Sequence, residues 1–238
     1  MHSPPVPGWS QRMKWWVADL GAARCSQVIA LALLLIQAGL QLAGGLERVP
    51  WIYRLLGLSR EGIAAGEAWQ LASHALLHGG WVHAALNVTL LMTAGSRIER
   101  ISGGGELMKV FAAGAIGGGL FFLLFPPPAP GIPLVGASGA VFALILWLTT
   151  ASPDSRMWPV PVSARNLGLG LLLASGGLAI ATPWLAGGEF PVAHSCHFGG
   201  ALAGWLMARR HLRSPVDLQQ LQKERARREA ADGPGESR

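Results

Sequence analysis

The stretch VFAAGAIGGGLFFLLFPPPAPGIPLVGASGAVFALILWLTTASP, residues 110–153, contains no charged side chain. It is long enough for two membrane helices, because a helix needs about 20 apolar residues to cross a bilayer. The segment PPPAPGIP, residues 126–133, divides it, since proline lacks a backbone donor and forces extended backbone. The sequence therefore predicts two membrane helices, at about 106–125 and 136–151, on either side of a proline-rich loop.

The rest of the chain repeats this pattern of long uncharged segments. Of its 238 residues, 51% are hydrophobic and 13% are charged, whereas a soluble domain carries about a quarter charged residues. We therefore predict an all-α membrane protein, a bundle of transmembrane helices. The six predicted transmembrane helices are 26–45, 81–96, 106–125, 136–151, 166–186 and 192–209.

The domain organisation follows from these spans. Residues 1–25 form an N-terminal segment, 26–210 the six-helix domain and 211–238 a basic tail. The segment 46–80 is too mixed in character for a span. Its aromatic residues suit a loop in the membrane interface, because Trp and Tyr gather at that depth.

The basic residues predict the orientation of the chain. With the N-terminus inside, sixteen of the 19 Lys and Arg residues fall in cytoplasmic segments, and three, Arg48, Arg54 and Arg60, fall in outer loops. Cytoplasmic loops are enriched in Lys and Arg. We therefore expect both termini in the cytoplasm and Ser138 toward the outer face. The cations after 208 have no aromatic residues among them, so we do not expect nucleic acid as a partner.

Polar side chains inside the predicted spans, or just before them, mark candidate functional positions, because burying them in a membrane is costly. They fall in three groups: His74, His78, His83 and Asn87; Ser138; and His194 and His197. Spacing of four places His83 and Asn87 on one helical face. That pair either donates hydrogen bonds into the bundle or ties two helices together, and spacing does not choose.

A metal site is another interpretation of these histidines, because imidazole is a common zinc ligand. No acidic residue lies in the predicted helices 81–96 and 192–209, which carry His83, His194 and His197. The two cysteines, Cys25 and Cys196, fit neither a metal motif nor a disulfide framework. We therefore expect no metal and no cofactor.

Ser138 lies at the beginning of a predicted apolar helix, between Gly136 and Gly139. Free backbone N–H groups at a helix N-terminus stabilise negative charge, which an oxyanion needs. A serine becomes a nucleophile only when a base removes its proton, and a histidine on another helix would supply that base. The alternative is a small packing residue, because Gly-X-Ser-Gly is also a common pattern in membrane helices.

The ordered set of motifs is more specific than any member. WQLASHALLHGGWVHAALN (69–87), SRIERISG (96–103), GASGAVFAL (136–144) and HFGGALAG (197–204) together resemble the rhomboid family of intramembrane serine proteases. The resemblance covers about residues 26–210. It implies a six-helix bundle with an L1 loop in the membrane interface, and cleavage of transmembrane proteins near the outer boundary through an acyl-enzyme.

The resemblance also implies residue roles. Ser138 would be the nucleophile and His197 the general base, because Gly200 and Gly204 follow His197 as in the family motif. His194 is the competing base, and helical periodicity alone does not choose between the two. His83 and Asn87, with the Ser138 N–H, would form the oxyanion hole. His74, His78 and Glu99 would be structural.

Two positions depart from the family pattern. Gln70 follows Trp69 where the family often has arginine, which removes a charge from the loop and makes its geometry less certain. Phe142 stands where the family often has tyrosine; its ring can still stack on the catalytic histidine. Neither departure removes a catalytic group.

The expected function is therefore an intramembrane serine endopeptidase of a bacterial inner membrane, with transmembrane proteins as substrates and the lipid bilayer as its surroundings. The alternative is a rhomboid-like protein that binds transmembrane helices without cutting them. Such members usually lack the serine or the histidine, and both are present here. A short rhomboid that processes sorting-tailed surface proteins is a rival within the family, and a membrane metal or ion carrier is a third reading.

Overall fold

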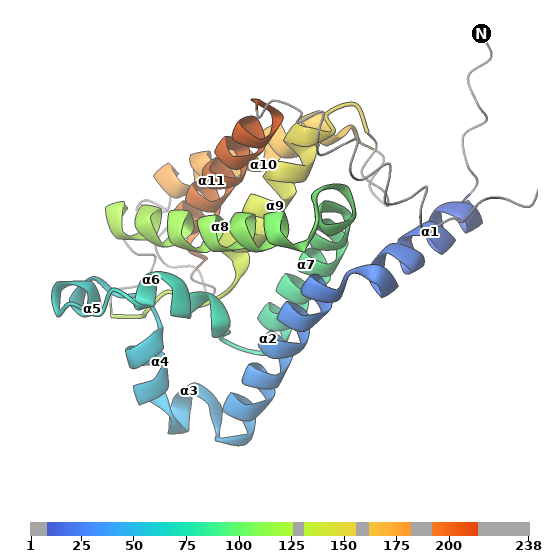
Figure 1. The fold of residues 1–238 in the computed structure, drawn as a ribbon. Coiled ribbons are helices and arrows are strands. Elements are labelled where there is room, and N and C mark those ends of the chain that lie inside the picture. Colours follow the sequence, from blue (N-terminus) through green and yellow to red (C-terminus); the bar gives the residue numbers. More distant parts are fainter. Residues whose placement is uncertain (1–8, 126–130, 156–161, 182–191, 214–238) are drawn as a thin grey trace, which may run out of the picture.

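The computed structural model describes residues 9–125, 131–155, 162–181 and 192–213, and these contain helices but no β-strand. The helices are α1 (Trp9–Ala22), α2 (Arg24–Leu42), α3 (Gly45–Arg48), α4 (Pro50–Leu56), α5 (Arg60–Ala64), α6 (Gln70–Ser73), the 3-10 helix η1 (His74–Leu76), α7 (Trp81–Ser102), α8 (Gly104–Leu124), α9 (Ser138–Ala151), α10 (Ala164–Ala181) and α11 (His194–Arg213). The predicted all-α class is confirmed (Figure 1).

Each of the six predicted membrane segments contains a helix, α2 and α7 to α11; residues 182–186 of the fifth lie outside the described part of the chain. By length and composition, α2, α8 and α10 are each able to cross a membrane, and α7 passes together with Gln70–Leu76, bent by 99°. The helix α11 is more polar than α2, α8 and α10, because it contains histidines and a basic last turn. With 14 residues, α9 is about 21 Å long, short of the roughly 30 Å hydrocarbon core.

The short helix α9 lies inside the bundle, with α8 and α11 packed against it (Figure 1). Almost every side chain from Gly139 to Thr149 is buried, including Trp147. Small residues allow the close approach. A Cβ at Gly200 would lie 2.0 Å from the Gly139 carbonyl oxygen, and one at Gly114 would lie 2.4 Å from the Ala143 Cβ. The three helices therefore meet almost backbone to backbone.

The segment 46–80, predicted as an interface loop, contains the short helices α3 to α6 and η1. Figure 1 shows these helices below α8, and α6 packs against it. A Cβ at Gly119 of α8 would lie 2.9 Å from Leu58 and 3.3 Å from His74 Nε2. The segment 46–80 thus packs against α8, the helix that also packs against α9.

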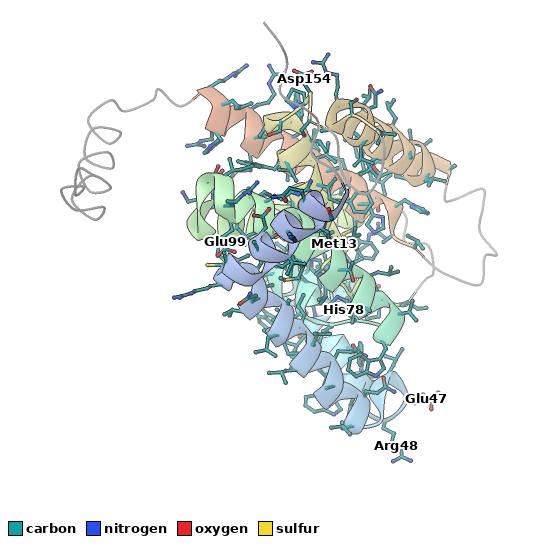
Figure 2. The ribbon with its side chains drawn as sticks, turned by 90° about the vertical axis from the view of Figure 1, so that its right-hand side faces the viewer. Met13, Glu47, Arg48, His78, Glu99 and Asp154 are labelled. Atoms are coloured by element: carbon teal, nitrogen blue, oxygen red, sulfur yellow. The ribbon has the colours of Figure 1, made fainter. Side chains whose placement is uncertain are left out.

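Glu99 holds the beginning of α2 from another helix. Its carboxylate accepts hydrogen bonds from the backbone N–H groups of Cys25 and Ser26, at 2.9 and 3.0 Å, and from the Ser26 hydroxyl. Free N–H groups at a helix N-terminus need such an acceptor. Figure 2 labels Glu99 at the bend between α1 and α2.

The N-terminal segment 1–25 contains the helix α1. An ion pair of 2.9 Å between Asp19 and Arg100 connects α1 to the end of α7. Glu47 and Arg48 lie at the opposite end of the molecule from Asp154 (Figure 2). The Arg48 end carries the short helices, and the Asp154 end carries the turn after α9.

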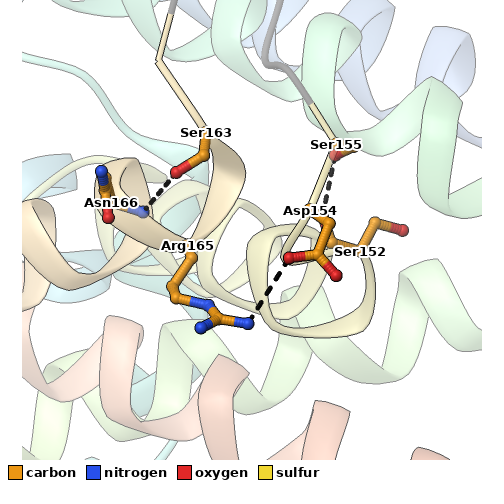
Figure 3. Close-up of polar contacts among 6 residues, drawn as sticks. All are labelled: Ser152, Asp154, Ser155, Ser163, Arg165 and Asn166. Atoms are coloured by element: carbon orange, nitrogen blue, oxygen red, sulfur yellow. Dashed lines mark hydrogen bonds and ion pairs between the residues drawn. The ribbon is translucent and has the colours of Figure 1, made fainter.

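The described residues just after α9 and at the start of α10 make local contacts on the exposed surface (Figure 3). The Ser163 hydroxyl accepts a bond from the Asn166 N–H at 3.3 Å and so caps α10. Arg165 meets Asp154 at 3.5 Å, with both side chains largely exposed, so the pair adds little stability.

Candidate active site

Ser138 follows an extended segment that is hydrogen-bonded to the 46–80 region. Leu134 exchanges two backbone bonds with Leu58, at 2.8 and 3.0 Å, in an isolated antiparallel bridge. The Gly136 N–H donates to the His74 carbonyl at 2.9 Å. These bonds fix the direction in which the chain enters α9.

The turn before Ser138 requires glycine at position 136. Gly136 has φ +121°, a conformation that side chains rarely adopt. A Cβ there would also lie 2.6 Å from Cε1 of His83. The turn therefore lets the His83 ring approach the backbone two residues before Ser138, which is itself half-buried at the first position of α9.

His197 of α11 lies against the face of α9 that carries Ser138. Its ring stacks on Phe142, with centroids 4.4 Å apart and planes inclined by 8°. Ser138 and Phe142 are four residues apart and so share one helical face. The close contact of Gly200 with Gly139 brings the two helices together beside the serine. The predicted stacking of Phe142 on His197 is present.

His194 lies beside His197 rather than in its place. Their ring centroids are 6.0 Å apart with the planes at 82°. The stacking partner on α9 belongs to His197, and His194 meets it edge-on. The arrangement therefore favours His197 over His194 as the imidazole next to Ser138.

The other predicted site residues, His83 and Asn87, lie on α7. Asn87 donates one amide hydrogen to the His83 carbonyl at 3.0 Å, and its amide carries a second. His83 lies against the turn at Gly136, two residues before Ser138, and His197 stacks on Phe142, one helical turn after it. The fold thus brings His83, Ser138 and His197 together from three helices, with Asn87 one turn along α7.

His74 and His78 are completely buried. His74 Nε2 lies 3.3 Å from the Ala115 carbonyl of α8, so it ties the loop to the bundle. His78, in contrast, contacts residues of the candidate site. Its ring meets His83 edge-on at 5.1 Å, and its Nε2 accepts a bond from the Ala137 N–H at 3.5 Å.

This contact of His78 with Ala137 was missed by sequence reasoning. The spacing of four between His74 and His78 indicated a shared face, yet the partner lies far along the chain. Among the described residues, no group of three His, Cys, Asp or Glu side chains is placed to hold a metal ion.

Gln70 is a buried hydrogen-bonding centre of the loop. Its Oε1 accepts the Ser59 N–H at 3.0 Å, and its Nε2 donates to the Arg54 carbonyl at 3.0 Å and to Glu67 at 2.6 Å. An amide both donates and accepts, whereas arginine has no acceptor. Gly62 makes room, because a Cβ there would lie 2.3 Å from Gln70. The neutral side chain therefore suits this loop.

Replacing Gln70 by leucine is expected to lower the free energy of unfolding by about 2 kcal/mol, because buried partners lose their hydrogen bonds. Thermal unfolding in detergent would measure it. Gln70→Glu should cost at least as much, since it loses the donors and adds a carboxylate beside Glu67. Gln41→Leu, at the exposed end of α2, is the matched control. Equal melting temperatures for the variants at 70 and 41 would contradict this account.

A family profile described as "Rhomboid domain" matches residues 65–214. The "Rhomboid protease GluP" of Bacillus subtilis is 29% identical over 147 residues, which are 61% of this chain and 26% of that protein. The "RHOMBOID-like protein 5" of Arabidopsis thaliana is 31% identical over 160 residues, 67% of this chain and 49% of that protein.

A further relative is the "Rhomboid protease GlpG" of Klebsiella pneumoniae, 28% identical over 149 residues, 60% of this chain and 48% of that protein. The chain thus spans between about a quarter and a half of the length of these curated relatives. The matched profile covers α6 to α11 and every candidate site residue.

Proposed function

The chain belongs to the rhomboid family, and from this we propose that it is an intramembrane serine endopeptidase with a Ser138–His197 dyad. Ser138 Oγ attacks the carbonyl carbon of the substrate while the imidazole of His197 takes the serine proton. The C–N bond then breaks, the imidazolium returns the proton to the leaving amine, and water hydrolyses the ester. The substrates are transmembrane proteins, cut near the outer membrane boundary.

The observation that carries this proposal is the stacking of His197 on Phe142, on the helical face that begins with Ser138. A base must lie within reach of the hydroxyl it activates, and its ring must be held in place. Phe142 holds the ring, and the glycine contacts between α9 and α11 bring it near the serine.

His83, Asn87 and the Ser138 N–H are proposed to stabilise the oxyanion. Gly136 lets the His83 ring approach the turn before Ser138, and Asn87 lies one helical turn further along α7. Donors fixed before the reaction stabilise developing charge without reorganisation. His194 is left outside the reacting atoms in this scheme.

The protein is an integral membrane protein, and we place it in a bacterial inner membrane with both termini in the cytoplasm. Sixteen of the 19 Lys and Arg residues then lie on the cytoplasmic side. This orientation puts Ser138 toward the outer side. We retain 26–210 as the catalytic domain and 211–238 as a basic cytoplasmic tail.

Reaction with a fluorophosphonate probe tests the function without a known substrate. The Ser138 oxygen forms a bond to phosphorus, fluoride leaves, and His197 takes the proton. We expect mass spectrometry of the purified protein in liposomes to find the label on Ser138, and vesicles with transmembrane reporters to show cleavage. A label on another serine, or none in liposomes, would contradict the proposal.

A further inference from the structure

The segment that leads into Ser138 forms hydrogen bonds with the 46–80 region at three positions. Leu134 pairs with Leu58, the Gly136 N–H donates to the His74 carbonyl, and the Ala137 N–H donates to His78 Nε2 at 3.5 Å. The first two contacts use backbone acceptors. The third uses a side-chain acceptor, so this contact exists only if the residue at position 78 can accept a hydrogen bond.

The His78 contact acts on the peptide unit next to the nucleophile. The Ala137 carbonyl accepts the Val141 N–H at 2.9 Å, so α9 itself fixes the peptide between Ala137 and Ser138. The preceding peptide has its N–H on His78. These two peptide planes together set the direction of the Ser138 N–H and the start of α9.

The same imidazole also touches the proposed oxyanion donor. His78 and His83 meet with ring centroids 5.1 Å apart and planes at 78°. The Tyr53 hydroxyl donates to the His78 carbonyl at 3.2 Å, and burial raises the pKa of this phenol, so it stays a donor. The backbone of His78 is therefore held by Tyr53 of α4. Its ring contacts both the turn before Ser138 and the His83 ring.

We propose that His78 is a positioning residue. It fixes the turn before Ser138 and the His83 ring in their positions relative to each other. This rests on the proposed protease function. The contact needs a lone pair on Nε2, so the ring is neutral with its proton on Nδ1. Nδ1 has no hydrogen-bond partner among the described residues, so Nε2 is the atom that holds the ring.

The experiment compares His78→Phe, which keeps a ring but removes the acceptor, with His78→Gln, which keeps an acceptor at similar reach. We measure the maximal rate and the half-saturating concentration of fluorophosphonate labelling of the full chain in liposomes. His78→Phe should slow the maximal rate about tenfold, since small misplacements of reacting groups are costly. His78→Gln should stay within about threefold of wild type.

His74→Gln is the matched control, because His74 is an equally buried histidine whose side chain contacts α8. It should lower the melting temperature and leave the maximal rate within about twofold, since its side chain does not touch the turn. A wild-type rate for folded His78→Phe, or equal slowing by Phe and Gln at 78, would overturn the inference.

If His78→Phe does not fold, His78→Gln decides alone: a rate within about threefold of wild type supports the inference, and a loss of tenfold or more overturns it. Failure of the protease function itself would look different. In that case the wild-type protein would carry no label on Ser138.

Discussion

Replacing Ser138 by alanine is expected to remove fluorophosphonate labelling and to lower cleavage of a transmembrane reporter by at least about 10³-fold. The variant lacks the only atom that forms the covalent bond in the proposed reaction. Ser138 is half-buried at the first position of α9, so the loss of one hydroxyl should leave the fold intact. A melting temperature close to wild type would check this.

Variants of the two histidines of α11 distinguish the general base from the histidine beside it. His197→Ala should slow labelling of Ser138 by about 10³-fold, because the hydroxyl loses its base. His194→Ala, three residues away on the same helix, should stay within about tenfold, since its ring only meets His197 edge-on at 6.0 Å. The reverse order of losses would assign the base to His194. Equal labelling of wild type and Ser138→Ala would reject the nucleophile.

The second large effect is expected from Gly200→Ala. Its new Cβ would lie 2.0 Å from the Gly139 carbonyl oxygen and 2.6 Å from the carbonyl carbon. Backbone atoms cannot turn aside as a flexible side chain does, so α11 must move away from α9. We expect a loss of about 3 kcal/mol in unfolding free energy from overpacking. The displaced His197 should cost about 100-fold or more in labelling rate.

Gly177→Ala in α10 is the matched control, because nothing lies within 4 Å of a Cβ there. Alanine has the higher helix propensity, so this variant should melt at or above the wild-type temperature. Thermal unfolding and the labelling rate are measured on both proteins. A Gly200→Ala protein with wild-type stability and rate would show that the contact between α9 and α11 is looser than described.

The sequence predicts the main helices because long uncharged runs and prolines mark them. Each of the six predicted segments is helical over its main described part, although α2 begins at Arg24 and α11 ends at Arg213. Glu99 was expected to be structural, and it accepts hydrogen bonds from the first N–H groups of α2. The motif order also identified the residues that the fold brings together around Ser138, while their chemical roles remain predictions.

The 46–80 segment could not be predicted at this level because tertiary contacts shape it. Its short helices depend on partners distant in sequence, such as the Tyr53 hydroxyl on the His78 carbonyl. Gln70 looked like the loss of a loop charge, yet its amide forms hydrogen bonds with Ser59, Arg54 and Glu67. The α1 helix is likewise held by Asp19 and Arg100, a pair that no local pattern indicates.

The shortness of α9 has a consequence for how substrates are chosen. If Ser152 lies at one edge of a 30 Å hydrocarbon layer and α9 runs along the membrane normal, its 14 residues leave Ser138 about 9 Å short of the opposite edge. A peptide bond reaching it must leave its own helix in a medium where unpaired backbone groups cost several kcal/mol each. Under the proposed function, the protein would therefore rank transmembrane segments by how readily they melt locally, and side-chain fit would refine that ranking.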